Sequence, residues 1–177
     1  PSVDDALLNT CLEQFLRPTV KAMAAEDCPY TGTLYGGIIL PDSGPEILEY
    51  NCRFGDPETQ EILPRLKSDL AQILMATAQG RLAEVQVEWS DEVCVCVVVA
   101  SGGYPGKYEK GKVITGIDAA QQDPKVTVFH AGTAIKDGQL VTNGGRVLGV
   151  TALGSDYRDA LDRCYEAVKK IHFDGMY

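Results

Sequence analysis

The first part of the chain carries apolar side chains at the spacing of an amphipathic helix. Leu8, Leu12 and Leu16 lie on one stripe of the segment 4–25, and this pattern predicts a helix that packs one face on a sheet. Pro18 is expected to break or kink this helix, because proline lacks the N–H that an interior helical position donates.

A hairpin and a second helix are predicted after this segment. Residues 34–40 and 46–51 are strand-like, and the sequence Pro-Asp-Ser-Gly-Pro between them has the composition of a turn. A helix is predicted over residues 68–79, ended by Gly80. Asp56 before Pro57 fits a helix N-cap followed by proline at the first helical position.

The composition changes at about residue 84, after which short β-rich runs dominate. The expected strands are residues 85–89, 93–100, 125–130, 140–142 and 146–152. The last element, residues 156–171, has an apolar stripe from Tyr157 to Ile171 behind a Ser155 cap, so a helix should cover one face of this part. The pattern predicts an α+β chain with a boundary near residues 89–93.

Composition narrows the class of protein. The 177 residues are 45% apolar and 23% charged, with a net charge of −9 and no basic cluster; this balance predicts a soluble protein and disfavours binding to nucleic acid, which depends on neutralising phosphates. No apolar run is long enough to suggest a membrane span. The six cysteines lack the spacing of a zinc site and are expected to be reduced thiols of a cytoplasmic protein.

The strongest candidate chemistry lies on the second arm of the predicted hairpin. Glu49, Asn51 and Arg53 are two residues apart, so on an extended strand they would project from one face. Carboxylate and amide oxygens suit Mg²⁺ (or Mn²⁺), which takes few protein ligands and completes its shell with water and substrate phosphates. A guanidinium beside them suits a phosphoryl group in transfer. Ile47 would share this face and could line a nucleotide pocket, or be ordinary core.

A longer sequence motif strengthens this hypothesis. Residues 53–60, Arg-Phe-Gly-Asp-Pro-Glu-Thr-Gln, resemble the signature of the phosphoribosylamine-glycine ligase (glycinamide ribonucleotide synthetase) family, whose members are ATP-grasp enzymes of purine synthesis. Four further segments resemble the family in the same order. They are residues 100–106, 129–133, 142–148 and 171–175.

The resemblance implies a fold and a division into domains. Residues 1–90 would be the carboxy-terminal part of an ATP-grasp lobe, an antiparallel sheet with helices, and residues 91–177 a small β-rich C-domain covered by the final helix. The chain would be a carboxy-terminal fragment that lacks the amino-terminal domain and nucleotide lid, and would be inactive by itself.

The resemblance also implies an activity, which is the joining of glycine to 5-phosphoribosylamine with ATP cleavage through glycyl phosphate. Glu49 and Asn51 would hold the metal, Glu49 and Ile47 would adjoin the nucleotide, and Arg53 would act on the transferred group. Asp56 would either bind substrate or cap the helix that follows it.

The glycine-rich loops are the remaining candidates. Gly102, Gly103 and Arg146 would bind the ribose phosphate if their loops are more than tight turns. Two rivals remain for the chain as a whole, namely another ATP-grasp carboxylate-amine ligase and a non-catalytic assembly module.

Overall fold

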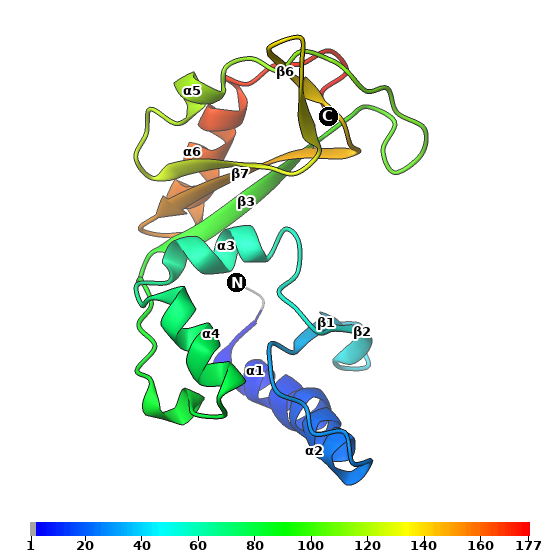
Figure 1. Ribbon diagram of the computed structural model, residues 1–177, viewed down its shortest axis with the longest axis vertical. Coiled ribbons are helices and arrows are strands. Elements are labelled where there is room, and N and C mark those ends of the chain that lie inside the picture. The colour runs from blue at the N-terminus through cyan, green and yellow to red at the C-terminus, as the bar shows by residue number, and fades with distance from the viewer. Residues whose placement is uncertain (1–2) are drawn as a thin grey trace. The chain divides into compact units, whose positions relative to one another are not determined.

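The computed structural model describes residues 3–177 and divides into two compact units. The first comprises the chain up to Gly55 together with Asp69–Gln86, and the second comprises Asp56–Ser68 and Val87–Tyr177. Figure 1 shows the helices and strands of both units. The division does not fall at one point of the sequence, because the segment directly after Gly55 belongs to the second unit.

The first unit begins with one helical segment. It consists of α1 (Asp5–Cys11), a π-helical stretch (Leu12–Leu16) and α2 (Arg17–Ala25). Asp4 caps its start by accepting a hydrogen bond from the Leu7 N–H at 2.8 Å. The expected break at Pro18 is wrong. The helix continues through this residue, the wider π-helical turn lies just before it, and within that turn the Arg17 N–H donates to the Leu12 carbonyl.

The predicted hairpin and second helix are both present in this unit. β1 (Tyr35–Ile39) pairs antiparallel with β2 (Glu46–Asn51). α4 (Leu70–Ala78) begins at an Asp69 cap and ends before Gly80, whose φ of +69° is the left-handed conformation that glycine adopts at helix ends. A short 3₁₀ turn (Leu82–Glu84) follows.

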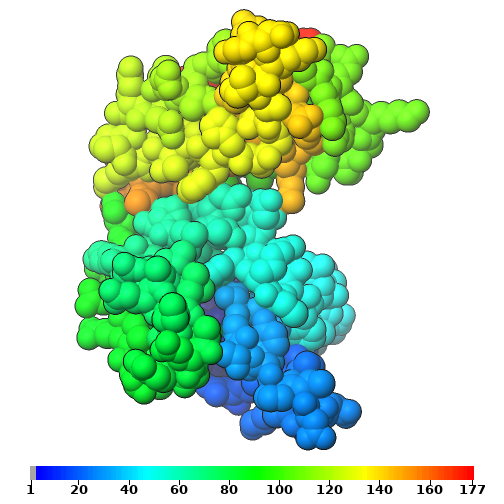
Figure 2. All heavy atoms as spheres, viewed as in Figure 1, coloured from blue at the N-terminus to red at the C-terminus, as the bar shows by residue number. Residues whose placement is uncertain are grey.

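The second unit is built on a three-stranded antiparallel sheet in the order β3-β7-β4, with a separate two-stranded hairpin of β5 and β6. Its elements, in chain order, are α3 (Thr59–Arg65), β3 (Val93–Ala100), α5 (Ile117–Ala120), β4 (Val126–His130), β5 (Thr133–Lys136), β6 (Gln139–Thr142), β7 (Arg146–Gly154) and α6 (Tyr157–Val168). The hairpin lies on the surface (yellow in Figure 2), where Ile135 is 71% exposed.

Helices pack on the sheet through its central strand. Leu148 and Val150 of β7 are fully buried in one apolar cluster with Ala160 and Cys164 of α6. Gly149, between them, faces the other way, where a Cβ would lie 3.7 Å from Cγ of Gln60 on α3. Because β7 is covered by helices on both faces, it reads in the sequence as a continuous apolar run.

The β-rich part and its final helix are confirmed, with several corrections. No strand forms at residues 85–89, where Trp89 makes only an isolated bridge to Leu66. The cap of α6 is Asp156, which accepts from the Asp159 N–H, and not Ser155. Tyr157 is 64% exposed and lies off the apolar stripe.

The N-cap reading of Asp56 is also wrong. α3 begins only at Thr59, with Glu58 in the cap position, so the first helical residue follows Asp56 by three positions. Asp56 therefore has its carboxylate available for contacts other than the backbone of that helix. No helix within residues 3–177 is both long and apolar enough to cross a membrane.

Candidate functional site

Glu49 and Asn51, the predicted metal ligands, are in contact at the end of β2. Asn51 Nδ2 donates a hydrogen bond to Glu49 Oε1 at 3.0 Å, so both side chains project from one face of the strand. Glu49 is exposed and Asn51 is half-buried. The second carboxylate oxygen and the amide oxygen remain as hard ligands that suit Mg²⁺ or Mn²⁺. This donor set fits the metal that the sequence implies.

The cation would need further oxygens from outside the strand. Within residues 3–177, no group of three or more His, Cys, Asp or Glu side chains is arranged to hold a metal ion. A divalent cation at Glu49 and Asn51 would complete its shell with water and with phosphate oxygens of a nucleotide, as Mg²⁺ commonly does.

A β-bulge moves Ile47 to the other face of the hairpin. Gly37 pairs with Glu49 and Ile38 with Ile47, which leaves Leu48 as an extra residue in β2. A Cβ at Gly37 would lie 3.1 Å from Glu49 Cγ, whereas a Cβ at its neighbour Gly36 would lie 3.4 Å from Ile47 Cδ1. Since consecutive residues face opposite sides, the expectation that Ile47 shares the face of Glu49 is wrong. A role of Ile47 in the nucleotide pocket stays a prediction without that support.

Arg53 lies beyond the strand. β2 ends at Asn51, and Arg53 is in a bend where its Nη1 donates to the Phe54 carbonyl at 2.8 Å. The two-residue spacing on an extended strand therefore does not place this guanidinium, and the expectation that it continues the strand is wrong. Its side chain is exposed, and its catalytic role stays a prediction.

In the second unit, two predicted substrate residues 90 positions apart are brought together. Arg146 Nη1 donates to the Asp56 carbonyl at 2.7 Å, and Nη2 lies 3.4 Å from Asp56 Oδ2. A guanidinium has five N–H donors in a planar fork, so this pairing leaves donors for a further anion. The arrangement fixes Arg146 at the start of β7 while keeping it 39% exposed.

The glycine-rich loops converge on the same place. Ser101 donates its N–H to the Gly145 carbonyl at 2.7 Å and its hydroxyl to the Gly144 carbonyl at 2.9 Å. The Asn143 N–H donates to the Gly132 carbonyl at 2.7 Å. A Cβ at Gly132 would lie 2.7 Å from the Gly144 Cα, so only glycine permits this close approach of the loops. Three segments that resemble the family thus form one cluster next to Arg146.

The structure explains Gly102 and Gly103 as parts of a tight turn. The Gly102 N–H donates to the Gly175 carbonyl at 2.7 Å, so it is not free for an anion. Gly103 has a φ of +96°, which favours glycine, and a Cβ there would collide with the Lys107 carbonyl. The turn accounts for both glycines without a substrate, and their role in substrate binding stays a prediction.

Tyr104 is a further residue of this loop cluster, and the sequence did not single it out. Its ring lies over Gly145, where a Cβ would be 2.7 Å from Tyr104 Cε2, and the side chain is 41% exposed. It forms a tilted ring pair with Tyr108, with centroids 6.3 Å apart. The only signal in the sequence was its place directly after the Ser-Gly-Gly turn.

Two of the thiols, Cys94 and Cys164, are poor nucleophiles. Burial raises the pKa of Cys94 to about 11 and that of Cys164 to about 12, so both are protonated at neutral pH. All six cysteines are free, as expected. A covalent thioester route has no support from Cys94 or Cys164.

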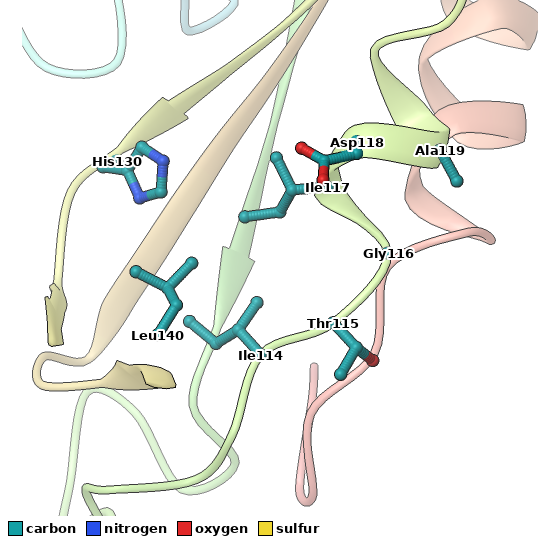
Figure 3. A pocket seen from close by; sticks show the side chains of 8 residues that line it. All are labelled: Ile114, Thr115, Gly116, Ile117, Asp118, Ala119, His130 and Leu140. Atoms are coloured by element: carbon teal, nitrogen blue, oxygen red, sulfur yellow. The ribbon is translucent and has the colours of Figure 1, made fainter. Parts of the chain in front are cut away.

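The second unit also has an open pocket of about 590 Å³, away from the predicted residues. Figure 3 shows Ile114, Ile117 and Leu140 facing this hollow, with Asp118 and His130 on opposite sides of it. His130 Nδ1 lies 3.1 Å from Thr133 Oγ1, which accounts for one of its ring nitrogens. None of the predicted site residues lines this pocket.

Two family models match parts of the chain. Residues 1–59 match the family model described as phosphoribosylglycinamide synthetase, ATP-grasp (A) domain, and residues 94–177 match the model of its C domain. The chain belongs to the phosphoribosylglycinamide synthetase family. The two family matches together cover most of the chain.

Individual relatives agree over the whole chain. A phosphoribosylamine-glycine ligase of Caldanaerobacter subterraneus is 47% identical over all of this chain and 42% of its own length. The chloroplastic enzyme of Arabidopsis thaliana is 44% identical over 99% of this chain and 34% of its own length. The chain thus spans less than half the length of these curated relatives.

Solved structures resemble the chain to different degrees. The crystal structure of a phosphoribosylamine-glycine ligase from Thermotoga maritima has a TM-score of 0.82 and 36% identity, covering 99% of this chain and 43% of that one. An N5-carboxyaminoimidazole ribonucleotide synthetase from the same organism has a TM-score of 0.61 at 13% identity, covering 97% of this chain and 44% of its own. The second likeness concerns the fold alone.

Proposed function

We infer that the whole protein carrying this chain joins glycine to 5-phosphoribosylamine, with cleavage of ATP to ADP and phosphate. The observation that carries this proposal is the contact between Asn51 Nδ2 and Glu49 Oε1 on an exposed face of β2. This contact holds two side chains with hard oxygen ligands side by side, which supports a site for a divalent cation bound to a triphosphate. The names of the relatives and the family match support the choice of glycine and phosphoribosylamine.

The proposed route has two balanced steps. A carboxylate oxygen of glycine attacks the γ-phosphorus of ATP, ADP leaves, and glycyl phosphate forms. The amine nitrogen of phosphoribosylamine then attacks the acyl carbon, phosphate leaves, and the nitrogen loses a proton. Activation is required because a free carboxylate is a poor acyl donor.

This chain would supply groups that stabilise charge in the phosphoryl transfer and a group that binds phosphoribosylamine. Glu49 and Asn51 would hold a divalent cation, which compensates the charge of the triphosphate when bound. Arg53 would stabilise charge on the transferred phosphoryl group. Arg146, fixed by Asp56, would bind the ribose phosphate with its remaining N–H donors.

The proposal includes a domain division and a location. Residues up to about 90 would form the end of the ATP-grasp domain, and residues 91–177 would form the C domain. The family matches at residues 1–59 and 94–177 support this boundary. The substrates would be small molecules, with neither nucleic acid nor membrane as a partner, and the enzyme would act in the cytoplasm.

ADP release by the full-length protein tests the function. We expect release to require both glycine and phosphoribosylamine, and to fall at least a hundredfold in Glu49→Gln while the protein stays folded. Glu46→Gln, on the same strand, is the matched control and should retain activity. Release that continues when glycine is replaced by another carboxylate would point to a different ATP-grasp ligase, and absence of magnesium-dependent ATP binding would point to a non-catalytic module.

A further inference from the structure

Gln60 is a polar residue for which the proposed reaction gives no role, yet it lies against Asp56. It is the second residue of α3, and its Nε2 donates to Asp56 Oδ1 at 3.0 Å. The same carboxylate directs its other oxygen, Oδ2, to Arg146 Nη2 at 3.4 Å. One carboxylate therefore bridges an amide donor and a guanidinium.

The other end of the Gln60 amide is buried at a cost. Its Oε1 has no hydrogen-bond partner within the described residues 3–177 and is shielded from solvent. A Cβ at Gly149 of β7 would lie only 3.7 Å from Gln60 Cγ, so the side chain lies along the sheet. A buried acceptor without a partner is destabilising, and a folded protein that retains one requires an explanation.

The contact with Asp56 provides that explanation. An ionised carboxylate only accepts hydrogen bonds, so the amide must turn its nitrogen toward Asp56 and its oxygen toward the sheet. We propose that Gln60 is a positioning residue for substrate phosphate: it holds one oxygen of Asp56 so that the other oxygen and the carbonyl fix Arg146. This inference rests on the proposed role of Arg146 in binding the ribose phosphate.

The side chain required at position 60 follows from these contacts. Methionine has a similar length and volume but no donor, and glutamate would place a second carboxylate against Asp56. Gln60→Met also removes the buried acceptor that has no partner. The variant should therefore lose substrate affinity without losing stability, a combination that a residue needed only for packing would not show.

Steady-state kinetics of the full-length protein test the proposal. In Gln60→Met we expect KM for phosphoribosylamine to rise roughly tenfold, the effect of losing a hydrogen bond to a charged group, with kcat and KM for ATP and glycine nearly unchanged. The midpoint of thermal unfolding should stay the same or rise. Gln72→Met, on exposed α4, is the matched control and should leave all of these values unchanged.

A double-mutant cycle with Asp56→Ala separates positioning from packing. If Gln60 acts through Asp56, then adding Gln60→Met to Asp56→Ala should change KM for phosphoribosylamine by less than about twofold. A full further tenfold rise in the double variant would overturn the proposal, as would an unchanged KM in Gln60→Met. Should Gln60→Met fail to fold, isosteric Gln60→Glu replaces it, with a larger rise in KM expected and an unchanged KM again counting against the proposal.

Failure of the proposed function has a different outcome. It would appear as wild-type protein that releases no ADP with glycine and phosphoribosylamine, whereas an active wild type with unaltered Gln60 variants removes only the positioning role. A crystal structure of Gln60→Met gives a reading independent of activity. The separation of Asp56 Oδ2 from Arg146 Nη2 should increase beyond 3.4 Å. An Asp56 carboxylate that has not moved would refute the proposal that Gln60 holds it in place.

Discussion

Replacing Gly145 by alanine tests whether the loops next to Arg146 are held together by close packing. A Cβ at Gly145 would collide with Tyr104 Cδ2, its nearest neighbour, and would lie 2.7 Å from Cε2 and 3.0 Å from Cγ of the same ring. Carbon atoms in ordinary contact are about 3.5–4.0 Å apart, so the ring would have to move by more than about 1 Å. The Gly145 carbonyl also accepts from the Ser101 N–H at 2.7 Å, so the backbone has little freedom to move instead.

The expected magnitude follows from the cost of overpacking. Inserting a methyl group into a filled site costs about 1–3 kcal/mol, and Tyr104 is half-exposed, so we expect the lower part of this range. For a chain of this size, each kcal/mol lowers Tm by about 2–4 °C. Gly145→Ala should therefore lower Tm by several degrees, and in the full-length protein it should raise KM for phosphoribosylamine because Arg146 is the next residue.

The assay is thermal unfolding of Gly145→Ala, Tyr104→Ala and the double variant. With the ring removed, the new methyl group no longer clashes, so the double variant should be more stable than the sum of the single effects by about 1 kcal/mol. Tyr165→Ala, on α6, is the matched control and should combine additively with Gly145→Ala. Wild-type stability of Gly145→Ala, or strict additivity with Tyr104→Ala, would refute this account of the cluster.

Three further predictions concern the second unit. Burial raises the pKa of the half-buried Glu61 above 4.5, partly opposed by the hydrogen bond that it accepts from the Cys96 N–H. Its protonated form therefore contributes stability that is lost as pH rises from about 4.5 through the raised pKa. Urea unfolding from pH 4 to 7 should show a smaller loss of stability in Glu61→Gln than in the wild type. Parallel curves of stability against pH for the two proteins would contradict this. Asp156→Ala removes the cap of α6 and should cost about 1 kcal/mol in the same assay, whereas no change would assign the cap elsewhere. Leu148→Ala in the fully buried centre of β7 should lower the free energy of unfolding by about 2–5 kcal/mol. A loss below about 1 kcal/mol would mean that Leu148 is not part of the packed core.

The sequence predicted the elements whose patterns are long or unambiguous. The apolar runs of β3 and β7 and the stripe of α6 are strong signals because each buries a continuous face. The β5–β6 hairpin was half missed, since the four residues of β5 include the exposed Ile135 and no apolar face. Residues 85–89 alternate like a strand but do not pair as one, and pairing is a tertiary property that alternation alone does not determine.

The candidate site shows the same limit. The shared face of Glu49 and Asn51 was predictable because residues two apart on a strand project to the same side, and their hydrogen bond confirms this. Their role as metal ligands stays a prediction. Ile47 was assigned to the wrong face because the bulge at Leu48 reverses the alternation of side chains between the two faces of the strand. No residue type in the strand indicates this bulge. The pairing of Arg146 with Asp56 joins segments 90 residues apart and could not be derived from local pattern.

Binding of Mn²⁺ to the full-length protein, followed by electron paramagnetic resonance with and without ATP, tests whether Glu49 binds the metal. Mn²⁺ prefers the same oxygen ligands as Mg²⁺ and is directly visible. We predict an ATP-dependent Mn²⁺ site in the wild type that is lost in Glu49→Gln and retained in Glu46→Gln, the control on the same strand. Equal Mn²⁺ binding by the wild type and Glu49→Gln would contradict the assignment of this strand to the metal.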